Sequence, residues 1–461
     1  MINDILAEKD FNKVLAALCL DPLEKDKAID DNRKAYMGDH EILHDTARLP
    51  KTVGTGKNAR VVKHTSETIP FQKRIVNSAV TFLFGEPVSL VLNNDKEEVF
   101  KLIQDLWKKC KLYYFDKRLA RDLFVETKAA ELWSVVKAVD GVAKARVTLL
   151  SKRESYLFYP HYDEYGDMDA FTVTYKLTDE KGKPVDHANI YTASQIITAI
   201  KGTAGWTQKT TPNLFGKIPV VYYEQDDPEW EDVKTEINRL EYLISNFGDA
   251  NDYNGSPITE IKGEVDNMPK KEDVGKVVRV KKEENSITGE VTYPGGVRYV
   301  SWDQAPESIK LEIETLKDII YGMTNTPDLS FSNVKGMSAV SGIALRLMFS
   351  DALFKAKDKQ EIFGEGMERR ISVMKSVLGV IDKGQAKSLD EADIDVVFND
   401  VLPEDLEALI RSLSLARGGE PIMSQKSAVD SNPLIQDATK ELEELEKESG
   451  ALKSFAESVN I

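Results

Sequence analysis

The stretches WEDVKTEINRLEYLISNF at 230–247 and IKLEIETLKDIIYGM at 309–323 decide the fold of this chain. In both, apolar residues recur at alternating spacings of three and four, which is typical of a helix packed along one narrow seam against another helix. The two apolar stripes are Trp230, Val233, Ile237, Leu240, Ile244 and Phe247, and Ile309, Ile313, Leu316, Ile320 and Met323. We therefore expect two long helices that each need a partner.

The other faces of both helices are rich in carboxylates. Four basic residues offset this charge only in part: Lys234, Arg239, Lys310 and Lys317. The acidic residues are Glu229, Glu231, Asp232, Glu236 and Glu241 around the first helix and Glu307, Glu312, Glu314 and Asp318 on the second. The pattern predicts acidic, solvated helix surfaces.

The segment between the two helices has a different character. It contains short strand-like pieces (SPITEIKG, GKVVRVKK and GGVRYVSW) separated by glycine, proline and asparagine turn signals. The chain is therefore expected to run out along one helix, form a small β-rich tip and return along the other helix.

A polar loop and a long helix follow the second stripe. Pro327 and Gly336 break residues 324–339, which favours a loop. Residues 340–385 then carry helical apolar spacing, and a helix of about 40 residues is on the order of 60 Å long. Gly364 and Gly366 are positions where such a helix can kink.

The rest of the chain predicts an α+β fold. Residues 1–37 and Thr68–Phe84 show helical patterns, and residues 46–66 resemble an exposed loop or extended arm. From Trp133 to Tyr223 the apolar period changes to two, which predicts an antiparallel meander. Residues 386–461 form a separate acidic segment with a helical pattern.

The composition narrows the class of protein. The chain has 461 residues, a formal net charge of -16 and only two cysteines, Cys19 and Cys110. Its bulk charge does not favour non-specific attraction to nucleic acid or to an anionic membrane. No signal-peptide pattern opens the sequence, and no window approaches 18 consecutive apolar residues. We expect a folded, soluble protein of a reducing intracellular compartment.

The segment HEILH at 40–44 matches the pattern in which two histidines bind zinc and a glutamate acts as base. A zinc-dependent hydrolase using His40, Glu41 and His44 is therefore an alternative hypothesis. A catalytic zinc needs a third protein ligand, and the sequence between His44 and Leu150 offers no Glu-x-x-x-Asp pattern to supply one. Gly38 and Pro50 also leave little room for the required helix, so we expect no metal here.

No other catalytic motif is present in the sequence. The segment VGTGKN at 53–58 ends in Gly-Lys, but Lys51 stands where a phosphate-binding loop needs glycine and Asn58 replaces the required Ser or Thr. We find no nucleophile constellation and no dinucleotide fingerprint, and we expect neither enzymatic activity nor a cofactor.

The loop at 324–339 contains side chains suited to weak contact with a phosphate backbone, without reading bases. These are Ser330, Ser332, Asn333, Lys335 and Ser338. From the residues alone, an ordinary solvent-exposed loop is the favoured interpretation.

Taken together, several segments resemble the portal proteins of tailed bacteriophages, specifically the siphovirus-type family of long-tailed phages. The resemblance rests on the order and spacing of the segments across most of the chain. Asn77 stands where the family often has aspartate, so we assign that position no role. The segments are YMGDHEIL at 36–43, GKNARVVKHTSETIPFQKRIVNSAVTFLFGEPVSL at 56–90, FGKIPVVYYE at 215–224, INRLEYLISNFGDANDY at 237–253, GMTNTPDLSF at 322–331 and SAVSGIALRLMFSDALFKAKDKQEIFGEGMERRI at 338–371.

The resemblance implies a portal fold with named regions. Residues 1–227 would form an α/β wing, with N-terminal helices and the antiparallel meander. The other regions would be a two-helix stem at 228–252 and 304–323, a β-rich clip at 253–303, a tunnel loop at 324–339, a wing-crossing helix at 340–385 and an α-helical crown at 386–461.

The resemblance also implies a function. A dodecameric ring at one capsid vertex would form a channel for double-stranded DNA, independent of sequence, serving packaging, head-tail joining and ejection. Expected partners are the terminase large subunit, the head-tail adaptor, and the major capsid and scaffolding proteins. Assembly would take place in the host cytoplasm, without a membrane. By location, clip residues Arg279, Lys281, Arg298 and Tyr299 are candidates for docking the terminase and the adaptor.

An acidic stem fits such a conduit, because like charge keeps phosphates from sticking while DNA passes. Ring closure through head-to-tail contacts would also bury the narrow helix stripes. A third hypothesis, besides the portal and the zinc hydrolase, is a coiled-coil assembly scaffold without DNA contact, which predicts rods or dimers instead of rings.

Overall fold

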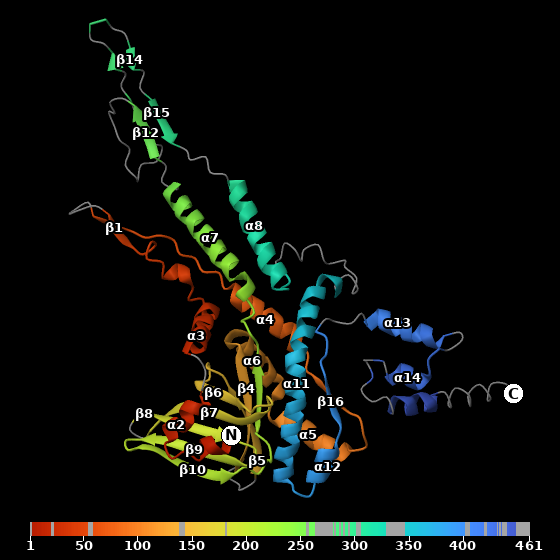
Figure 1. Ribbon diagram of the computed structural model, residues 1–461. Coiled ribbons are helices and arrows are strands. Elements are labelled where there is room, and N and C mark those ends of the chain that lie inside the picture. Colours follow the sequence, from red (N-terminus) through yellow and green to blue (C-terminus); the bar gives the residue numbers. More distant parts are fainter. Residues whose placement is uncertain are drawn as a thin grey trace, which may run out of the picture. The chain divides into compact units, whose positions relative to one another are not determined.

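The computed structural model divides the chain into two compact units (Figure 1). One unit comprises Met1–Asp328 and Asp351–Asn399, and the other comprises Leu329–Ser350 and Asp400–Ile461. The structure describes residues 2–19, 23–53, 59–137, 143–179, 182–254, 258–262, 280, 283–284, 287–288, 291–293, 296–300, 306–328, 346–401, 406–418, 422–430, 432, 435 and 440–448.

Four helices build the centre of the larger unit. Their apolar faces share one buried core, in which Phe363 packs against the rings of Phe84 at 5.0 Å, Tyr223 at 5.4 Å and Phe124 at 6.1 Å between centroids. Such aromatic clusters bury large apolar areas and hold helices in a fixed register. The helices are α4 (Phe71–Phe84), α5 (Glu97–Lys109), α6 (Leu112–Glu126) and α11 (Ser350–Ile381).

Helix α11 is a single helix of 32 residues, about 48 Å long. It runs through both Gly364 and Gly366, the two positions where the sequence allows a kink. Gly366 is required by packing, since a Cβ there would lie 2.0 Å from Cε1 of Tyr223. Residues 340–345 of the expected long helix lie outside the described part of the chain.

The prediction that residues from Trp133 to Tyr223 form a single antiparallel meander is wrong, because their strands belong to two sheets. Five strands form a meander in the order β10-β9-β8-β7-β6, but β4 pairs with β5 on one side and with the distant β11 on the other. The period of two predicts strands but does not assign their partners. The strands are β4 (Lys128–Lys137), β5 (Ala143–Leu150), β6 (Tyr156–Tyr162), β7 (Met168–Thr178), β8 (Pro184–Tyr191), β9 (Gln195–Gly202), β10 (Gly205–Pro212) and β11 (Val220–Glu224).

Two N-terminal helices cover part of the five-stranded sheet. Helix α1 (Ile2–Leu6) precedes α2 (Phe11–Leu18), which begins at Asp10, whose carboxylate accepts the amide N–H of Asn12 at 3.0 Å. A capping side chain of this kind satisfies a free N–H at the helix start. The buried side chains of α2 then pack on a floor of small and β-branched residues, including Ala170, Ala188 and Ile190.

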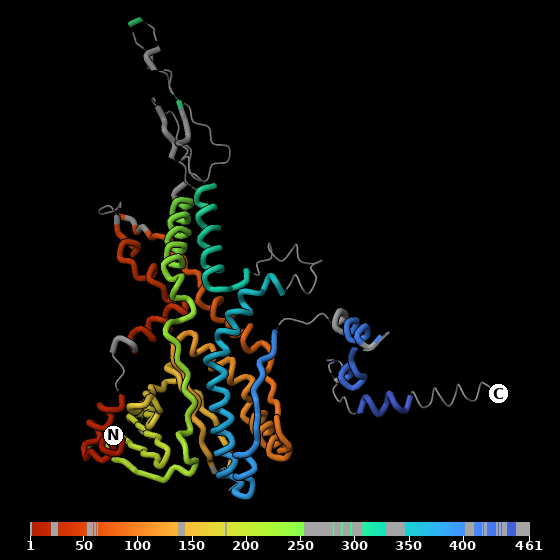
Figure 2. The backbone as a smooth tube through the Cα atoms, turned by 45° about the vertical axis from the view of Figure 1, so that its right-hand side comes forward, coloured from red at the N-terminus to blue at the C-terminus, as the bar shows by residue number. Residues whose placement is uncertain are grey.

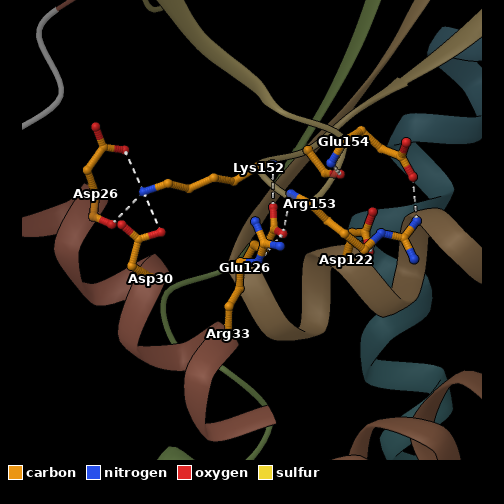
Figure 3. Close-up of polar contacts among 9 residues, drawn as sticks. Asp26, Asp30, Arg33, Asp122, Glu126, Lys152, Arg153 and Glu154 are labelled. Carbon is orange, nitrogen blue, oxygen red and sulfur yellow. Dashed lines mark hydrogen bonds and ion pairs between the residues drawn. The ribbon is translucent and has the colours of Figure 1, made fainter. Parts of the chain in front are cut away.

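An ionic cluster joins helix α3 (Leu23–Met37) to α6 and to the turn between β5 and β6 (Figure 3). Glu126 accepts the backbone N–H groups of Lys152 and Arg153 at 2.7 and 2.9 Å, and Arg33 lies 3.6 Å from its carboxylate. Burial, together with the nearby carboxylate of Asp122, raises the pKa of Glu126 to about 7. The α3 helix is thus docked through charged groups.

The two helices of the opening stretches are present as α7 (Lys234–Asn254), which follows a 3-10 turn at Glu231–Val233, and α8 (Pro306–Met323). They run side by side (Figure 2). In the chain between them, described strands pair as two ladders, β12 (Ile258–Lys262) with β15 (Gly296–Val300) and β13 (Glu283–Glu284) with β14 (Val291–Tyr293).

The expectation that residues 386–461 form one separate helical segment is wrong in its first part. After α12 (Ala386–Glu391), strand β16 (Ile394–Val397) pairs antiparallel with β3 (Ser89–Leu92), so residues up to Asn399 belong to the larger unit. Leu90, Ile394 and Val396 pack against the main core. The smaller unit contains α13 (Leu406–Arg417) and α14 (Gln425–Asp430).

Candidate functional site

The seam between α7 and α8 is buried at one end and half-buried toward the other. Val233, Ile237 and Leu240 of the first stripe and Ile320 of the second are at most 1% exposed. Ile244, Ile309 and Ile313 are only partly covered. Met323, which the spacing places in the seam, is instead 62% exposed. The helix pair therefore has a rigid base, where hydrophobic burial is complete.

Helix α8 presents three distinct sides. Its seam residues lie against α7. A second side is an exposed neutral strip, because Ser308, Thr315 and Ile319, which is 40% exposed, recur at spacings of seven and four. A third side is acidic, because Glu307, Glu314 and Asp318 recur at the same spacings, which place them on one face of a helix. Leu311, 65% exposed, lies on this acidic side, since it is four residues after Glu307 and seven before Asp318. One helix thus carries both an exposed neutral strip and a negatively charged row.

Two of the carboxylates expected on the solvated faces are buried instead. Glu229 is paired with Lys355 at 2.6 Å and Lys359 at 2.5 Å, and its side chain is only 3% exposed. Burial opposes the ionised form of Glu229, but the two lysines outweigh it and lower the pKa of this carboxyl. Glu241 is 1% exposed. Neither residue belongs to the acidic surface.

Glu241 is the partner of a histidine from the HEILH segment. Nδ1 of His40 lies 2.5 Å from Oε1 of Glu241, and Nε2 lies 2.8 Å from the carbonyl oxygen of Ala35. The Ala35 carbonyl can only accept, so Nε2 carries a hydrogen, and a second hydrogen on Nδ1 makes His40 an imidazolium paired with the Glu241 carboxylate. Burial alone lowers its pKa, but Glu241 outweighs burial, and the pKa of His40 lies above its ordinary value.

The HEILH segment does not form the helix that a zinc site of this pattern needs. Glu41–Leu43 is one turn of 3-10 helix, and Nε2 of exposed His44 lies 2.5 Å from the Asp39 carboxylate. Within the described ranges, no group of three or more His, Cys, Asp or Glu side chains could hold a metal ion. The buried histidine of this motif, His40, instead joins the N-terminal segment to Glu241 of α7.

A row of polar side chains on helix α7 binds the N-terminal segment. The row consists of Glu241, Ser245 and Asp249, spaced by four residues, and it accepts the backbone N–H groups of Ile69, Glu67 and Thr65 at 2.7, 2.9 and 2.6 Å. Arg48 also binds Asp249 at 2.8 Å. The segment expected to be a loop or arm is therefore docked, and its residues Lys51–Val53 and Arg60–Val62 pair as strands β1 and β2.

A buried charge network in the core was not predicted from the sequence. Arg370 of α11 contacts both carboxylate oxygens of Glu131, each 3.0 Å from its Nε, and reaches Asp116 at 2.6 Å. The Tyr223 hydroxyl donates to Glu131 at 2.6 Å. Burial raises the pKa of Asp116 to about 6, although Arg370 lowers it. One sequence feature could have indicated this network, namely that Arg370 occupies a position in the apolar stripe of α11.

Most predicted contact residues fall outside the part of the chain that the structure describes. These are Ser330, Ser332, Asn333, Lys335 and Ser338 of the loop, and Arg279 and Lys281 of the β-rich tip. Arg298 and Tyr299 lie on β15, opposite Glu260 and Thr259 of β12. Of the predicted contact residues, the described part of the chain therefore includes only these two neighbours on one strand.

Among the helices in the described ranges, none has the length and apolar character needed to cross a membrane. What the described residues do provide is a helix pair with a buried seam, an acidic row and an exposed neutral strip, on an α+β body. The class of this protein follows from comparison with known proteins.

That class is the portal proteins of bacteriophages. The model of the family described as "Phage portal protein, SPP1 Gp6-like" matches residues 23–453, and the chain belongs to this family. The chain is similar to a solved structure described as "Neck of empty GTA particle computed with C6 symmetry", with 10% sequence identity and a TM-score of 0.37, over 77% of this chain and 87% of that one. No curated protein sequence matches.

Membership of the family establishes the coarse function. The protein is a bacteriophage portal and head-tail connector, a structural component of the virion at a capsid vertex. Portal proteins act as oligomeric rings with capsid and tail partners. The α+β fold expected from the sequence is confirmed.

Proposed function

We propose that twelve copies of this chain form the portal ring, with α7 and α8 as the stem around an axial channel for double-stranded DNA. The observation that carries this proposal is that α8 has an acidic side and a separate exposed neutral strip. The strip of Ser308, Thr315 and Ile319 is suited to contact a neighbouring subunit, which a closed ring would supply. The row of Glu307, Glu314 and Asp318 would then face DNA and repel its phosphates.

The region boundaries follow from this assignment. The wing comprises the helices and sheets of the larger unit outside the stem, together with the wing-crossing helix α11. The clip occupies residues 253–303 and the tunnel loop residues 324–339. The crown begins after Asn399, because β16 is paired within the larger unit.

Contacts with DNA are assigned to the tunnel loop. In this proposal Lys335 makes a weak contact with the phosphate backbone, supported by Ser330, Ser332, Asn333 and Ser338. Such contacts carry no sequence information, which suits a channel that must pass a whole genome.

Contacts with partner proteins are assigned to the clip. Arg279, Lys281, Arg298 and Tyr299 would dock the terminase large subunit during packaging and the head-tail adaptor afterwards. The terminase would hydrolyse ATP, and the portal itself would have no enzymatic activity. Major capsid and scaffolding proteins would surround the ring during assembly in the host cytoplasm.

Electron microscopy of the purified protein, with its mass measured by light scattering, tests the ring. We expect rings with a central hole and a mass of about twelve chains. Rods or dimers would instead support a coiled-coil scaffold and overturn the proposal.

One pair of variants tests the role of the neutral strip. Ile319→Asp places a charge in the proposed subunit contact and should shift the protein from rings to smaller species. Lys310→Gln, on a charged side of the same helix, should leave rings intact. Unchanged rings with Ile319→Asp would exclude this strip from the interface.

A further inference from the structure

The chain leaves α8 through a compact turn immediately before the proposed tunnel loop. Asn325 is left-handed with φ 51°, the Thr326 N–H donates to the carbonyl of Tyr321 at 2.9 Å, and the Asn325 N–H donates to Gly322 at 3.2 Å. This pair of hydrogen bonds is the Schellman motif that ends many helices. Thr324 and Thr326 are both 5% exposed, so the turn is fixed inside the protein.

Helix α11 holds this turn from one side. Nζ of Lys355 donates to the Thr324 carbonyl at 3.0 Å and pairs with buried Glu229 at 2.6 Å. Lys355 lies only four residues after Asp351, where the chain returns to the larger unit. The residues before the loop and the residues after it are therefore joined directly.

Helix α4 holds the same turn from another side. The Arg74 guanidinium binds the Asp328 carboxylate at 3.1 Å and the Pro327 carbonyl at 3.4 Å. It also lies 4.7 Å above the ring of Tyr321, in the last turn of α8. A planar guanidinium can make these polar and stacking contacts together, whereas a lysine ammonium cannot reproduce both.

We propose that Arg74 and Lys355 are positioning residues that clamp the root of the tunnel loop, residues 324–328. The clamp fixes the end of α8 and the point from which the tunnel loop leaves the stem. This inference rests on the proposed role of the loop in DNA passage, and it adds the residues that set its starting point.

The test uses full-length rings and measures amide hydrogen exchange at residues 320–328 together with the amount of packaged DNA. Lys355→Met removes the contact with Thr324, while Glu229 keeps its second partner, Lys359. We expect exchange in this segment to become about tenfold faster, because a hydrogen bond from a charged donor is lost. Packaging should fall several-fold, and Lys355→Arg should restore part of both.

Lys357→Met is the matched control, since Lys357 is exposed on the same helix and should change neither readout. Arg74→Met should act like Lys355→Met, and Arg74→Lys should rescue only weakly. Unchanged exchange in both Met variants would overturn the clamp, and faster exchange with normal packaging would reduce it to a structural contact.

Lys335→Glu, measured in parallel, separates this inference from the proposed function. Normal packaging with that variant would remove the Lys335 contact from the mechanism. The clamp would still be judged by its own exchange and packaging measurements.

Discussion

The imidazole of His40 and the carboxylate of Glu241, 201 residues apart in sequence, form a buried ion pair with 2.5 Å between Nδ1 and Oε1. Glu241 belongs to the first of the paired helices, and His40 to the N-terminal segment that lies on it. The same carboxylate oxygen accepts the Ile69 N–H at 2.7 Å. One charge on the helix therefore holds two points of the segment.

This ion pair predicts a pH dependence of stability. The pKa of His40 is raised in the folded protein, so its stabilisation is fully present below the unfolded value of 6.5 and is lost as the pH rises through the folded value. The free energy of unfolding should fall on the alkaline side, and His40→Gln should flatten that slope. Urea titrations at several pH values measure this.

His44→Gln is the matched control for that experiment. Its partner Asp39 is exposed, and exposed pairs contribute little to stability. An unchanged alkaline slope in His40→Gln would contradict the imidazolium assignment.

Gly366→Ala should destabilise the protein by about 1–3 kcal/mol, because the new methyl group would overlap Tyr223 in a close-packed core. Gly364→Ala, two residues earlier in the same helix, meets nothing within 4 Å and should be neutral or stabilising by up to about 1 kcal/mol. The midpoint temperatures of thermal unfolding of the two variants should shift in opposite directions, or the Gly366→Ala midpoint should be clearly lower. Equal shifts would disprove the close approach of α11 and β11.

Arg370→Met should cost roughly 3–5 kcal/mol, since it leaves Glu131 and Asp116 buried without their cation. Arg369→Met, at the neighbouring half-exposed position, should cost much less. Denaturant unfolding measures both changes. Adding Glu131→Gln to Arg370→Met should recover part of the loss, and a purely additive double variant would contradict direct coupling between the two residues.

The pKa of the Glu126 carboxyl is raised, whereas a salt bridge lowers the pKa of a carboxyl. Its pKa is raised from 4.5 to about 7 by burial, so the free energy of unfolding should fall as the pH rises through this range. Glu126→Gln cannot ionise and should reduce that slope, although it loses one acceptor for the N–H groups of residues 152 and 153. The slope between pH 5 and pH 7 is the readout, and an unchanged slope would refute the shift.

Lys335→Glu should leave rings intact but reduce packaged DNA, because a like charge would meet the phosphate backbone. Lys383→Glu makes the same charge change at an exposed turn after α11 and should package normally. The amount of DNA protected in assembled capsids measures the effect. Equal packaging by the two variants would mean that the change at Lys335 has no specific effect.

Local patterns predicted the main elements well. The three-four spacing of Ile237, Leu240 and Ile244 defines α7, and the period of two marks the strands, because both patterns follow from backbone geometry. Strand partners such as β4 and β11, and β3 and β16, depend on contacts between distant segments, which spacing does not encode.

Polar contacts were harder to predict for the same reason. HEILH matches a zinc-binding pattern at which we expect no metal, and the sequence does not indicate that the partner of His40 lies 201 residues away. Glu229 and Glu241 were assigned to a solvated face, and only the fold shows the cations that make their burial favourable. The tunnel-loop and clip residues remain predictions from the sequence.

The pairing of β3 with β16 sets an order for folding during synthesis. Leu90 and Leu92 emerge from the ribosome roughly 300 residues before Ile394 and Val396, the strand that pairs with them. Closing so long a loop is entropically unfavourable until the intervening helices have folded. The larger unit cannot be completed before most of the chain has been translated, so a nascent portal subunit reaches its final fold only late in its synthesis.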